Sequence, residues 1–573
     1  MPGSLQILLL VLSLRLPLTL GETVARDSIP GAWSLVQMGT SGVSAMQLAV
    51  TSETTAIIYD KVEHNPLGVN GEVVWAAELN FDTLQVRALH PLSNTWCATG
   101  SFLSNGTLVN SGGNPIVITG ADGLQALRLF TPCTTGDCDV YEDQTRVRLT
   151  SPRWYPSSVR LQDGSILIFG GATTDVFINS PEVNNPSYEF FPPKNINGFN
   201  GLQIPSQFLV DTLNGNHFPN MVLLPNGKIF VSANQQAMIF DWQTNTETRL
   251  PGIPNGVRIS SPFSASHVLL PLSPQNDYTP EIMICGGSTL SDTIPPSEIS
   301  SQDPTSAQCI RMVLNGAGIA KGWSVEMMPQ GRIMVDMVLL PDGRVMLVNG
   351  AMTGVAGYGD VPDQIGHSNA DNPAFMPVVY DPNAPADSRF STDGLVASTI
   401  ARVYHSTATL TPNGTVMLAG SNPNNDITTV KYATEYRLEF FSPPYINVPR
   451  PSYTGLPATI NYNTEFHLAV TLPADTTDVT VALMDLGFQT HGVHMDQRLV
   501  QLVSTLSADK KTLTVHAPPT SSIYPPGPAY LYVVTESGAP SFGHKTIVGT
   551  GASPPVDEGA IANMLANTSG PSD

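Results

Sequence analysis

The chain has 573 residues, of which 41% are hydrophobic and 13% charged, and 47 acidic against 26 basic residues give a net charge of −21. A chain this acidic repels polyanions, which excludes nucleic acid as a non-specific partner. The hydrophobic share suffices for a large core, and 48 glycines with 49 prolines favour a turn-rich, all-β protein over a helical one.

Residues 5–20 are almost entirely apolar, and ordinary polar sequence begins at Gly21. Arg15 and Pro17 interrupt this run, so it does not suit a membrane span. We therefore expect residues 1–21 to be a secretory signal peptide and the protein to be secreted, extracellular and without a membrane partner. Glycosylation sequons, which agree with secretion, begin at Asn105, Asn413 and Asn567.

One short pattern recurs along most of the chain: an apolar strand, an Asn-Gly or Asp-Gly turn, a second apolar strand and often Gly-Gly. These dipeptides are strong hairpin signals, because a tight hairpin turn needs positive φ. Copies occupy residues 102–113, 159–171, 222–231, 338–348 and 408–418, with a longer-looped copy at 267–287 and a weaker one at 46–59. Seven such hairpins predict a seven-bladed, kelch-like β-propeller rather than a stack of separate sandwiches.

The hairpin pattern stops near Pro443, so we expect the propeller to occupy residues 22–443. Short apolar strands follow at residues 465–472, 479–484, 512–515 and 529–534. They predict a C-terminal Ig-like β-sandwich over residues 444–549. Residues 550–573 are rich in glycine, serine and proline, and we expect them to form a flexible tail.

The chain has five cysteines, an odd number that leaves one sulfur unpaired in an oxidising compartment. Cys133 and Cys138 lie in one short loop, and Cys285 and Cys309 flank a polar segment, so each pair is expected to form a disulfide. Cys97 is then left over. It is either a buried free thiol or a sulfur used in other covalent chemistry.

No Gly-x-Ser-x-Gly, His-Glu-x-x-His, P-loop or dinucleotide-binding motif is present, which argues against the corresponding enzyme classes. Instead, Tyr155 and the pair Tyr404-His405 stand just before two of the hairpins. Positions just before such strands line one end of a propeller's central channel, so these side chains are expected to converge. The late segment 490–498 contains two further histidines, His491 and His494. Two phenolates and two imidazoles suit Cu(II). The alternative is that each tyrosine is a half-buried core residue with its hydroxyl at the rim.

The sequence around Cys97 and the segments 152–158, 402–406 and 490–498, in this order on a kelch-like propeller, resemble the radical copper oxidases. This family includes galactose oxidase and glyoxal oxidase. Too few residues precede the first hairpin for the extra N-terminal sandwich of the galactose oxidase layout. The chain is therefore more similar to the secreted, fungal-type glyoxal oxidases.

The resemblance implies one copper ion bound by Tyr155, Tyr404, His405 and His491. It also implies a thioether bond between Cys97 and the ring of Tyr155, which makes a protein-derived radical cofactor and accounts for the odd cysteine. Tyr155 would be the equatorial ligand and one-electron redox partner, and Tyr404 the axial ligand and general base.

His491 competes with His494 for the second imidazole position, since both lie in the 490–498 segment. On an extended strand, two residues three apart face opposite sides, so only one can point at the metal. We choose His491 because it follows Thr490 as in the family pattern, and we expect a structural or supporting role for His494.

The resemblance implies a monomeric enzyme that oxidises small aldehydes such as glyoxal and methylglyoxal, as their hydrates, to carboxylic acids and reduces O2 to H2O2. Extracellular peroxidases are implied as users of the H2O2. One alternative is a primary alcohol or galactose-type oxidase with the same copper site. Another is a non-catalytic kelch propeller used for binding, which would hold no copper and keep Cys97 unmodified.

Overall fold

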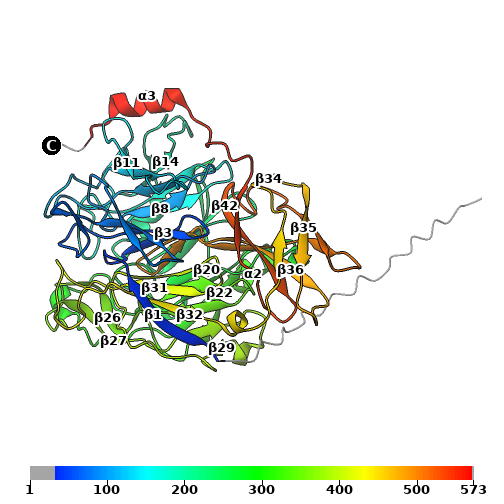
Figure 1. The fold of residues 1–573 in the computed structure, drawn as a ribbon. Helices are drawn as coiled ribbons and strands as arrows, with labels where there is room; N and C mark the ends of the chain where they lie inside the picture. Colours follow the sequence, from blue (N-terminus) through cyan, green and yellow to red (C-terminus); the bar gives the residue numbers. More distant parts are fainter. Residues whose placement is uncertain (1–31, 571–573) are drawn as a thin grey trace, which may run out of the picture.

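The computed structural model describes residues 32–570, and most of the regular structure in this range is β-strand (Figure 1). The all-β prediction is thereby confirmed. The expected signal peptide, residues 1–21, lies outside the described residues. Within residues 32–570 there is no helix with the length and apolar composition that crossing a membrane requires.

All seven predicted hairpins are present as antiparallel strand pairs. In the turns the glycine has positive φ, for example 80° at Gly164 and 93° at Gly414, as the Asn-Gly and Asp-Gly signals require. The pairs are β2 (Gln47–Val50) with β3 (Thr55–Tyr59), β8 (Thr99–Phe102) with β9 (Leu108–Ser111), β12 (Ser157–Arg160) with β13 (Ile166–Phe169), β16 (Asn220–Leu223) with β17 (Ile229–Ala233), β20 (Ser266–Leu269) with β21 (Glu281–Cys285), β24 (Asp336–Leu339) with β25 (Val345–Val348), and β30 (Ser406–Leu410) with β31 (Val416–Gly420).

Each hairpin belongs to a separate antiparallel sheet of four or six strands in the described part of the chain. Further strands complete these sheets: β6 (Ala76–Asn80), β7 (Val86–Leu89), β10 (Leu127–Phe130), β11 (Tyr141–Glu142), β14 (Ser187–Phe191), β15 (Ile204–Pro205), β18 (Gln236–Asp241), β19 (Thr246–Arg249), β22 (Gln308–Val313), β23 (Ser324–Met327), β28 (Val378–Tyr380), β29 (Phe390–Ser391) and β32 (Arg437–Ser442). The first described strand, β1 (Ser34–Thr40), pairs with β32, so the last of these sheets joins both ends of the segment 34–442.

The first strands of successive sheets contact one another: β8 with β12, β12 with β16, β16 with β20, β20 with β24, β24 with β30 and β30 with β2. The sheets therefore stand side by side with their first strands turned towards a common centre. Short elements lie on the connections between the strands: β4 (Gly68–Val69), β5 (Glu72–Val73), α1 (Gln207–Asp211), α2 (Gly316–Lys321), β26 (Ala351–Tyr358) and β27 (Ser368–Pro373).

After residue 448 the chain forms two further sheets, which lie to one side of the others in Figure 1. In β35 buried and exposed residues alternate, and buried side chains such as Leu468 pack against Leu483 and Leu531 of the second sheet. One sheet has β33 (Ser452–Thr454), β35 (Glu465–Thr471), β41 (Thr512–His516) and β40 (Ser504–Leu506), and the other β34 (Thr459–Ile460), β43 (His544–Val548), β42 (Gly527–Thr535), β36 (Val479–Asp485) and β39 (Arg498–Leu502).

One hairpin leaves this C-terminal part and enters the centre of the other sheets. It consists of β37 (Phe488–Thr490) and β38 (Val493–Met495). β37 pairs with β2, and β38 contacts β12, β16, β20 and β24. The C-terminal part thus contributes two strands to the central packing, with the turn of this hairpin at His491 and Gly492.

The C-terminal segment differs from the flexible tail expected over residues 550–573. Its described part contains a helix, α3 (Glu558–Asn567), which lies across the sheets that contain β11 and β14 (Figure 1). Asp557 caps the helix by accepting a hydrogen bond from the Ala560 backbone N–H. Ala560 and Met564, four residues apart on one helix face, are buried, and this apolar contact anchors the segment.

Both predicted disulfides are confirmed. Cys133 pairs with Cys138 inside one loop, and Cys285 pairs with Cys309 across β21 and β22. Cys97 is the remaining cysteine, and its side chain is free and buried.

A buried ion pair joins the two parts of the fold, and we expect it to contribute strongly to stability. The Arg160 guanidinium of β12 donates to the Asp485 carboxylate of β36, and both side chains are nearly inaccessible to solvent. Replacing Arg160 by Met leaves a buried, unpaired carboxylate, so we expect a loss of about 3–5 kcal/mol in unfolding free energy, measured by urea denaturation.

The matched control is Arg249→Met, which breaks the more exposed ion pair with Asp211. We expect this change to cost less than about 1 kcal/mol, since exposed pairs are screened by solvent. Equal costs for the two variants would contradict the large stability contribution expected of the buried Arg160–Asp485 pair.

Candidate metal and redox site

Three of the residues singled out in the sequence occupy equivalent places in the fold. Cys97, Tyr155 and Tyr404 each lie two residues before the first strand of a sheet, namely β8, β12 and β30. The backbone just before these strands is left-handed, with φ of 61° at Cys97, Tyr155 and His405. Phe218, which lies before β16 and is not a proposed site residue, is also left-handed, with φ of 48°. A left-handed residue before the first strand is therefore a feature of the repeated sheets, and the site uses it.

Backbone hydrogen bonds connect these left-handed residues from one sheet to the next. The Tyr155 N–H donates to the Cys97 carbonyl at 3.2 Å, and the Phe218 N–H donates to the Tyr155 carbonyl at 3.0 Å. Cys97 and Tyr155 are therefore neighbours through the backbone although they come from different sheets.

The two tyrosines are also supported in the same way. Arg153, two residues before Tyr155, donates to Glu189 at 2.7 Å. Arg402, two residues before Tyr404, donates to Glu439 at 3.0 Å. All four charged side chains are buried, and each arginine also donates to a glycine carbonyl at the end of the next strand. Both glutamates begin similar sequences, Glu-Phe-Phe-Pro-Pro at Glu189 and Glu-Phe-Phe-Ser-Pro-Pro at Glu439, so the two arginine–glutamate pairs are part of the repeat.

His491 reaches the site on the turn of the β37–β38 hairpin. Thr490 pairs with Val493, which leaves His491 and Gly492 as a two-residue loop with φ of 51° and 76°. Positive φ at both positions matches a type I′ turn, whose first residue is usually asparagine. The left-handed conformation is unfavourable for histidine and costs free energy, but it places His491 at the centre of the sheets.

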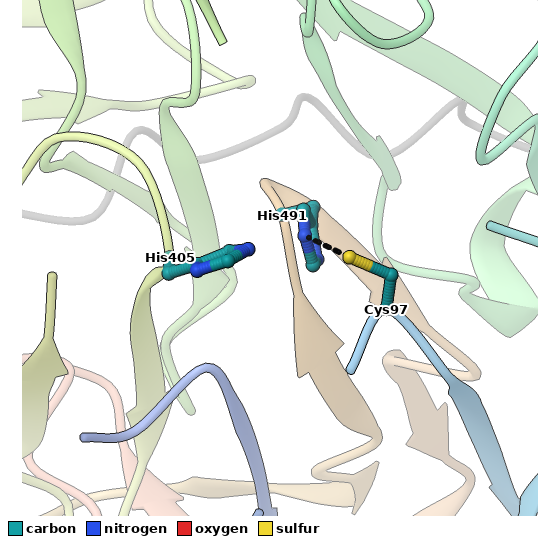
Figure 2. Close-up of side chains that lie close together, drawn as sticks. All are labelled: Cys97, His405 and His491. Carbon is teal, nitrogen blue, oxygen red and sulfur yellow. Dashed lines mark hydrogen bonds between the residues drawn. The ribbon is translucent and has the colours of Figure 1, made fainter. Parts of the chain in front are cut away.

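The five predicted site residues are brought together, and three of them are drawn in Figure 2. The ligand atoms of Cys97, His405 and His491 lie within 4.8 Å of one another, with Cys97 Sγ 3.4 Å from His491 Nε2. The hydroxyls of Tyr155 and Tyr404 are hydrogen-bonded to each other. The Tyr404 ring lies 3.8 Å from the His405 ring, and the Tyr155 ring 4.9 Å from the His491 ring, between centroids.

Hydrogen bonds define which nitrogen of each imidazole faces the site. His405 Nδ1 lies 3.1 Å from the Asn422 carbonyl, which can only accept, so Nδ1 carries the proton. Thr490 Oγ1 donates to the Met46 carbonyl at 3.0 Å and accepts from His491 Nδ1 at 2.6 Å. Both Nε2 atoms therefore present lone pairs, and His405 Nε2 has no hydrogen-bond partner among the described residues.

His494 does not join this cluster. Its Nε2 lies 2.8 Å from the Leu486 carbonyl and its Nδ1 3.4 Å from the Met337 carbonyl, so both nitrogens face backbone. His494 thus lies outside the cluster, as expected, but not because two residues on one extended strand face opposite sides. His491 and His494 are not on one extended strand, because the turn at Gly492 separates them.

Burial keeps the site uncharged when no cation is present. It lowers the pKa of His491 to about 3 and that of His405 well below its usual range, so both imidazoles are neutral. Burial also raises the pKa values of Tyr155, Tyr404 and Cys97 well above their usual ranges. A bound cation would favour the phenolates, so two imidazole nitrogens and two phenolate oxygens fit Cu(II).

Sequence reasoning assigned no role to the aromatic residues around Tyr155. The rings of Trp154, Phe218 and His217 lie 4.0, 4.5 and 5.1 Å from the Tyr155 ring, between centroids. Trp154 was visible as the residue before Tyr155, but nothing marked Phe218 or His217 in the sequence. All three side chains are buried and lie against the phenol ring.

Family models match both parts of the chain. Residues 46–445 match the model described as "Glyoxal oxidase N-terminus", and residues 450–548 match "Galactose oxidase-like, Early set domain". Their meeting point agrees with the place where the chain passes from the hairpin-bearing sheets to the two C-terminal sheets.

Similar proteins include two plant enzymes and one fungal structure. Aldehyde oxidase GLOX of Vitis pseudoreticulata is 33% identical over 90% of this chain and 97% of its own length. Aldehyde oxidase GLOX1 of Arabidopsis thaliana is 31% identical over 90% of this chain and 84% of its own. A fungal alcohol oxidase of the AA5 family, solved with copper, has a TM-score of 0.68 at 17% identity over 91% of this chain and 100% of its own, a likeness of fold.

The buried histidines should make the unfolding free energy of the metal-free protein depend on pH. Burial lowers the pKa of His494 to about 4, whereas an unfolded chain titrates near its ordinary value of about 6.5. Between these values the unfolded state binds more protons, so stability falls as pH falls, by about 1.4 kcal/mol per unit for each such histidine.

His494→Gln removes one of these groups. We expect the variant to lose roughly 2–3 kcal/mol less unfolding free energy than the original chain between pH 6.5 and pH 4.5. Urea denaturation at the two pH values measures the difference. An identical loss in both proteins would mean that His494 is protonated in the folded state.

Proposed function

The chain belongs to the glyoxal oxidase family of radical copper oxidases, and on this premise we propose that it oxidises small aldehydes to carboxylic acids with O2 as acceptor. The observation that carries the proposal is the meeting of two phenols and two neutral imidazoles in one buried cluster. Substrates of the glyoxal and methylglyoxal type would react as hydrates, each yielding one acid and one H2O2.

Membership of this family also supports proposals about the architecture and the location of the protein. The seven sheets with hairpins are proposed to be the blades of a kelch-like propeller over residues 22–443, and the two C-terminal sheets an Ig-like sandwich over residues 444–549. The contacts between successive first strands support the propeller. We also propose that the protein is secreted, with residues 1–21 as its signal peptide, and two disulfides support this location. A monomeric state and the supply of H2O2 to extracellular peroxidases are proposed from the family resemblance alone.

In the proposed site His405 and His491 would hold copper through Nε2, and Tyr155 and Tyr404 would hold it through their phenolate oxygens. Bound copper supplies one of the two one-electron acceptors that the reaction needs. Tyr404 Oη receives the proton of the substrate hydroxyl, and the oxidised Tyr155 receives the hydrogen atom from carbon. The substrate hydrate thus loses two electrons and two protons in all, which O2 takes up as H2O2.

Cys97 is proposed to form a thioether bond to the Tyr155 ring. The backbone hydrogen bond between the two residues and their shared buried cluster support this bond. The thiol hydrogen and one ring hydrogen leave as two protons and two electrons, which O2 takes up as H2O2. The sulfur donates electron density to the ring, so the phenol becomes easier to oxidise.

Oxygen uptake on a matched panel tests the proposed function. Glyoxal and methylglyoxal should be consumed with one H2O2 for each acid formed, and faster than galactose or simple primary alcohols. Faster turnover of the alcohols would instead indicate an alcohol oxidase with the same site. Absence of O2 uptake by copper-loaded protein on every substrate would favour a non-catalytic binding protein.

The turn that carries His491 allows ligand loss to be separated from loss of fold. Asparagine suits the first position of a type I′ turn, so His491→Asn should keep the stability of the metal-free protein within about 1 kcal/mol. It should lose copper, measured as metal per chain by mass spectrometry, because one imidazole is gone.

The matched control for this test is His494→Gln, on the same hairpin, which should still bind one copper ion per chain. If His494→Gln abolishes binding and His491→Asn preserves it, the proposed ligand set is wrong.

The proposed thioether predicts a mass change. After aerobic copper loading, intact mass should fall by about two daltons beyond disulfide formation, and the Cys97 and Tyr155 peptides should stay linked under reducing conditions. Cys97→Ser should still fold and bind copper, because it removes no proposed ligand, but it should lose most of its activity. Unlinked peptides from a fully active enzyme would contradict the thioether and the radical mechanism.

A further inference from the structure

A buried ion pair lies beside the site and takes no part in the proposed chemistry. Lys61 and Glu63 follow β3, and Lys61 is 1% exposed and Glu63 is 0% exposed. Lys61 Nζ donates to the Glu63 carboxylate at 2.6 Å. Moving both charges out of water costs free energy, and an apolar pair of similar volume is often as stable. Stability alone is therefore a weak explanation for this pair.

The ion pair is connected to the metal site through Asn422, which is also buried. Asn422 Nδ2 donates to the second oxygen of Glu63 at 2.7 Å. The Asn422 backbone forms hydrogen bonds with two proposed ligands. Its N–H donates to the Tyr404 carbonyl at 2.8 Å, and its carbonyl accepts from His405 Nδ1 at 3.1 Å. Displacement of Asn422 would disturb both residues.

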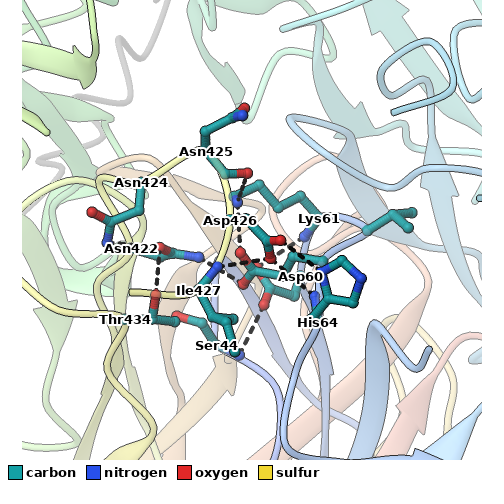
Figure 3. Close-up of polar contacts among 12 residues, drawn as sticks. Ser44, Asp60, Lys61, His64, Asn422, Asn424, Asn425, Asp426, Ile427 and Thr434 are labelled. Atoms are coloured by element: carbon teal, nitrogen blue, oxygen red, sulfur yellow. Dashed lines mark hydrogen bonds and ion pairs between the residues drawn. The ribbon is translucent and has the colours of Figure 1, made fainter. Parts of the chain in front are cut away.

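The side chain of Asn422 is held from both ends. Its Oδ1 accepts hydrogen bonds from Asn424 and Thr434, each at 3.1 Å, while Glu63 holds its Nδ2. Figure 3 shows Asn422 with Asn424 and Thr434, and the nearby Lys61, whose Nζ also donates to the Asn425 carbonyl at 2.8 Å. Lys61 thus fixes the Glu63 carboxylate and the same loop that carries Asn422.

Lys61 also lies near the aromatic residues of the site. Its Nζ is 6.0 Å from the ring centres of Trp96 and Tyr358. The Tyr358 ring is 6.5 Å from the His405 ring, and Trp96 directly precedes Cys97. The ion pair therefore approaches the site through these rings as well as through Asn422.

We propose that Glu63, whose buried charge Lys61 compensates, is a positioning residue for His405. By accepting a hydrogen bond from the Asn422 amide, Glu63 holds the Asn422 carbonyl against His405 Nδ1–H, which fixes the tautomer and directs Nε2 into the site. The inference rests on the proposed copper function. Partners that orient a ligating histidine in this way typically contribute 10–100-fold to metal affinity.

Two double variants isolate the anchoring hydrogen bond. Lys61→Met/Glu63→Gln removes both charges but keeps an acceptor for Asn422 Nδ2, whereas Lys61→Met/Glu63→Leu removes the acceptor as well. We measure the Cu(II) dissociation constant of each metal-free protein by chelator competition, with the electron paramagnetic resonance spectrum of the loaded form. The Gln variant should stay close to the original chain, and the Leu variant should bind about 10–100-fold more weakly with an altered spectrum.

The control is Glu281→Leu/Arg311→Met, which removes an ion pair between β21 and β22. It should lower stability without changing copper affinity or the spectrum. Equal affinity and identical spectra for the Gln and Leu variants would overturn the positioning role.

If either Lys61/Glu63 double variant does not fold, Asn422→Ala decides, because it removes the anchored amide and keeps both charges. It should weaken copper binding, and unchanged binding would overturn the inference. Failure of the unsubstituted chain to bind copper would instead contradict the proposed function itself, so the two failures are distinguishable.

Discussion

The site depends on one backbone constraint, the left-handed residue that precedes the first strand of several sheets. Cys97 and Tyr155 both have this conformation, and a backbone hydrogen bond joins the two residues. Because the same feature recurs at Phe218, it follows from how these sheets stand side by side. Residues that are distant in the sequence meet because they hold equivalent positions in a repeat.

A second constraint is that the repeat alone does not complete the site. The remaining imidazole, that of His491, arrives on a hairpin from the C-terminal sheets, and β2 holds that hairpin by strand pairing. Folding of the C-terminal part is thereby coupled to assembly of the site. Burial then keeps both imidazoles neutral and both phenols protonated until a cation binds.

Much of this was predictable because it depends on local chemistry. The turn dipeptides required positive φ and located most of the hairpins, and an odd cysteine count singled out Cys97. Family motifs pointed to Tyr155, Tyr404, His405 and His491, which the structure brings together. The partners of these residues were not predictable, because Asn422 and Glu63 reach His405 only through contacts between distant segments. The packing of α3 was not predicted either, because only two residues of this helix are buried, too few to give a clear apolar pattern in the sequence.

We propose that copper lies between two phenols and two imidazoles that come from both parts of the chain. Anomalous diffraction at the copper edge, from crystals of the copper-loaded protein, locates the metal. We expect one peak for each chain, in bonding contact with the Nε2 atoms of His405 and His491 and the hydroxyl oxygens of Tyr155 and Tyr404. A peak bonded to Cys97 Sγ, or one away from these residues, would contradict it.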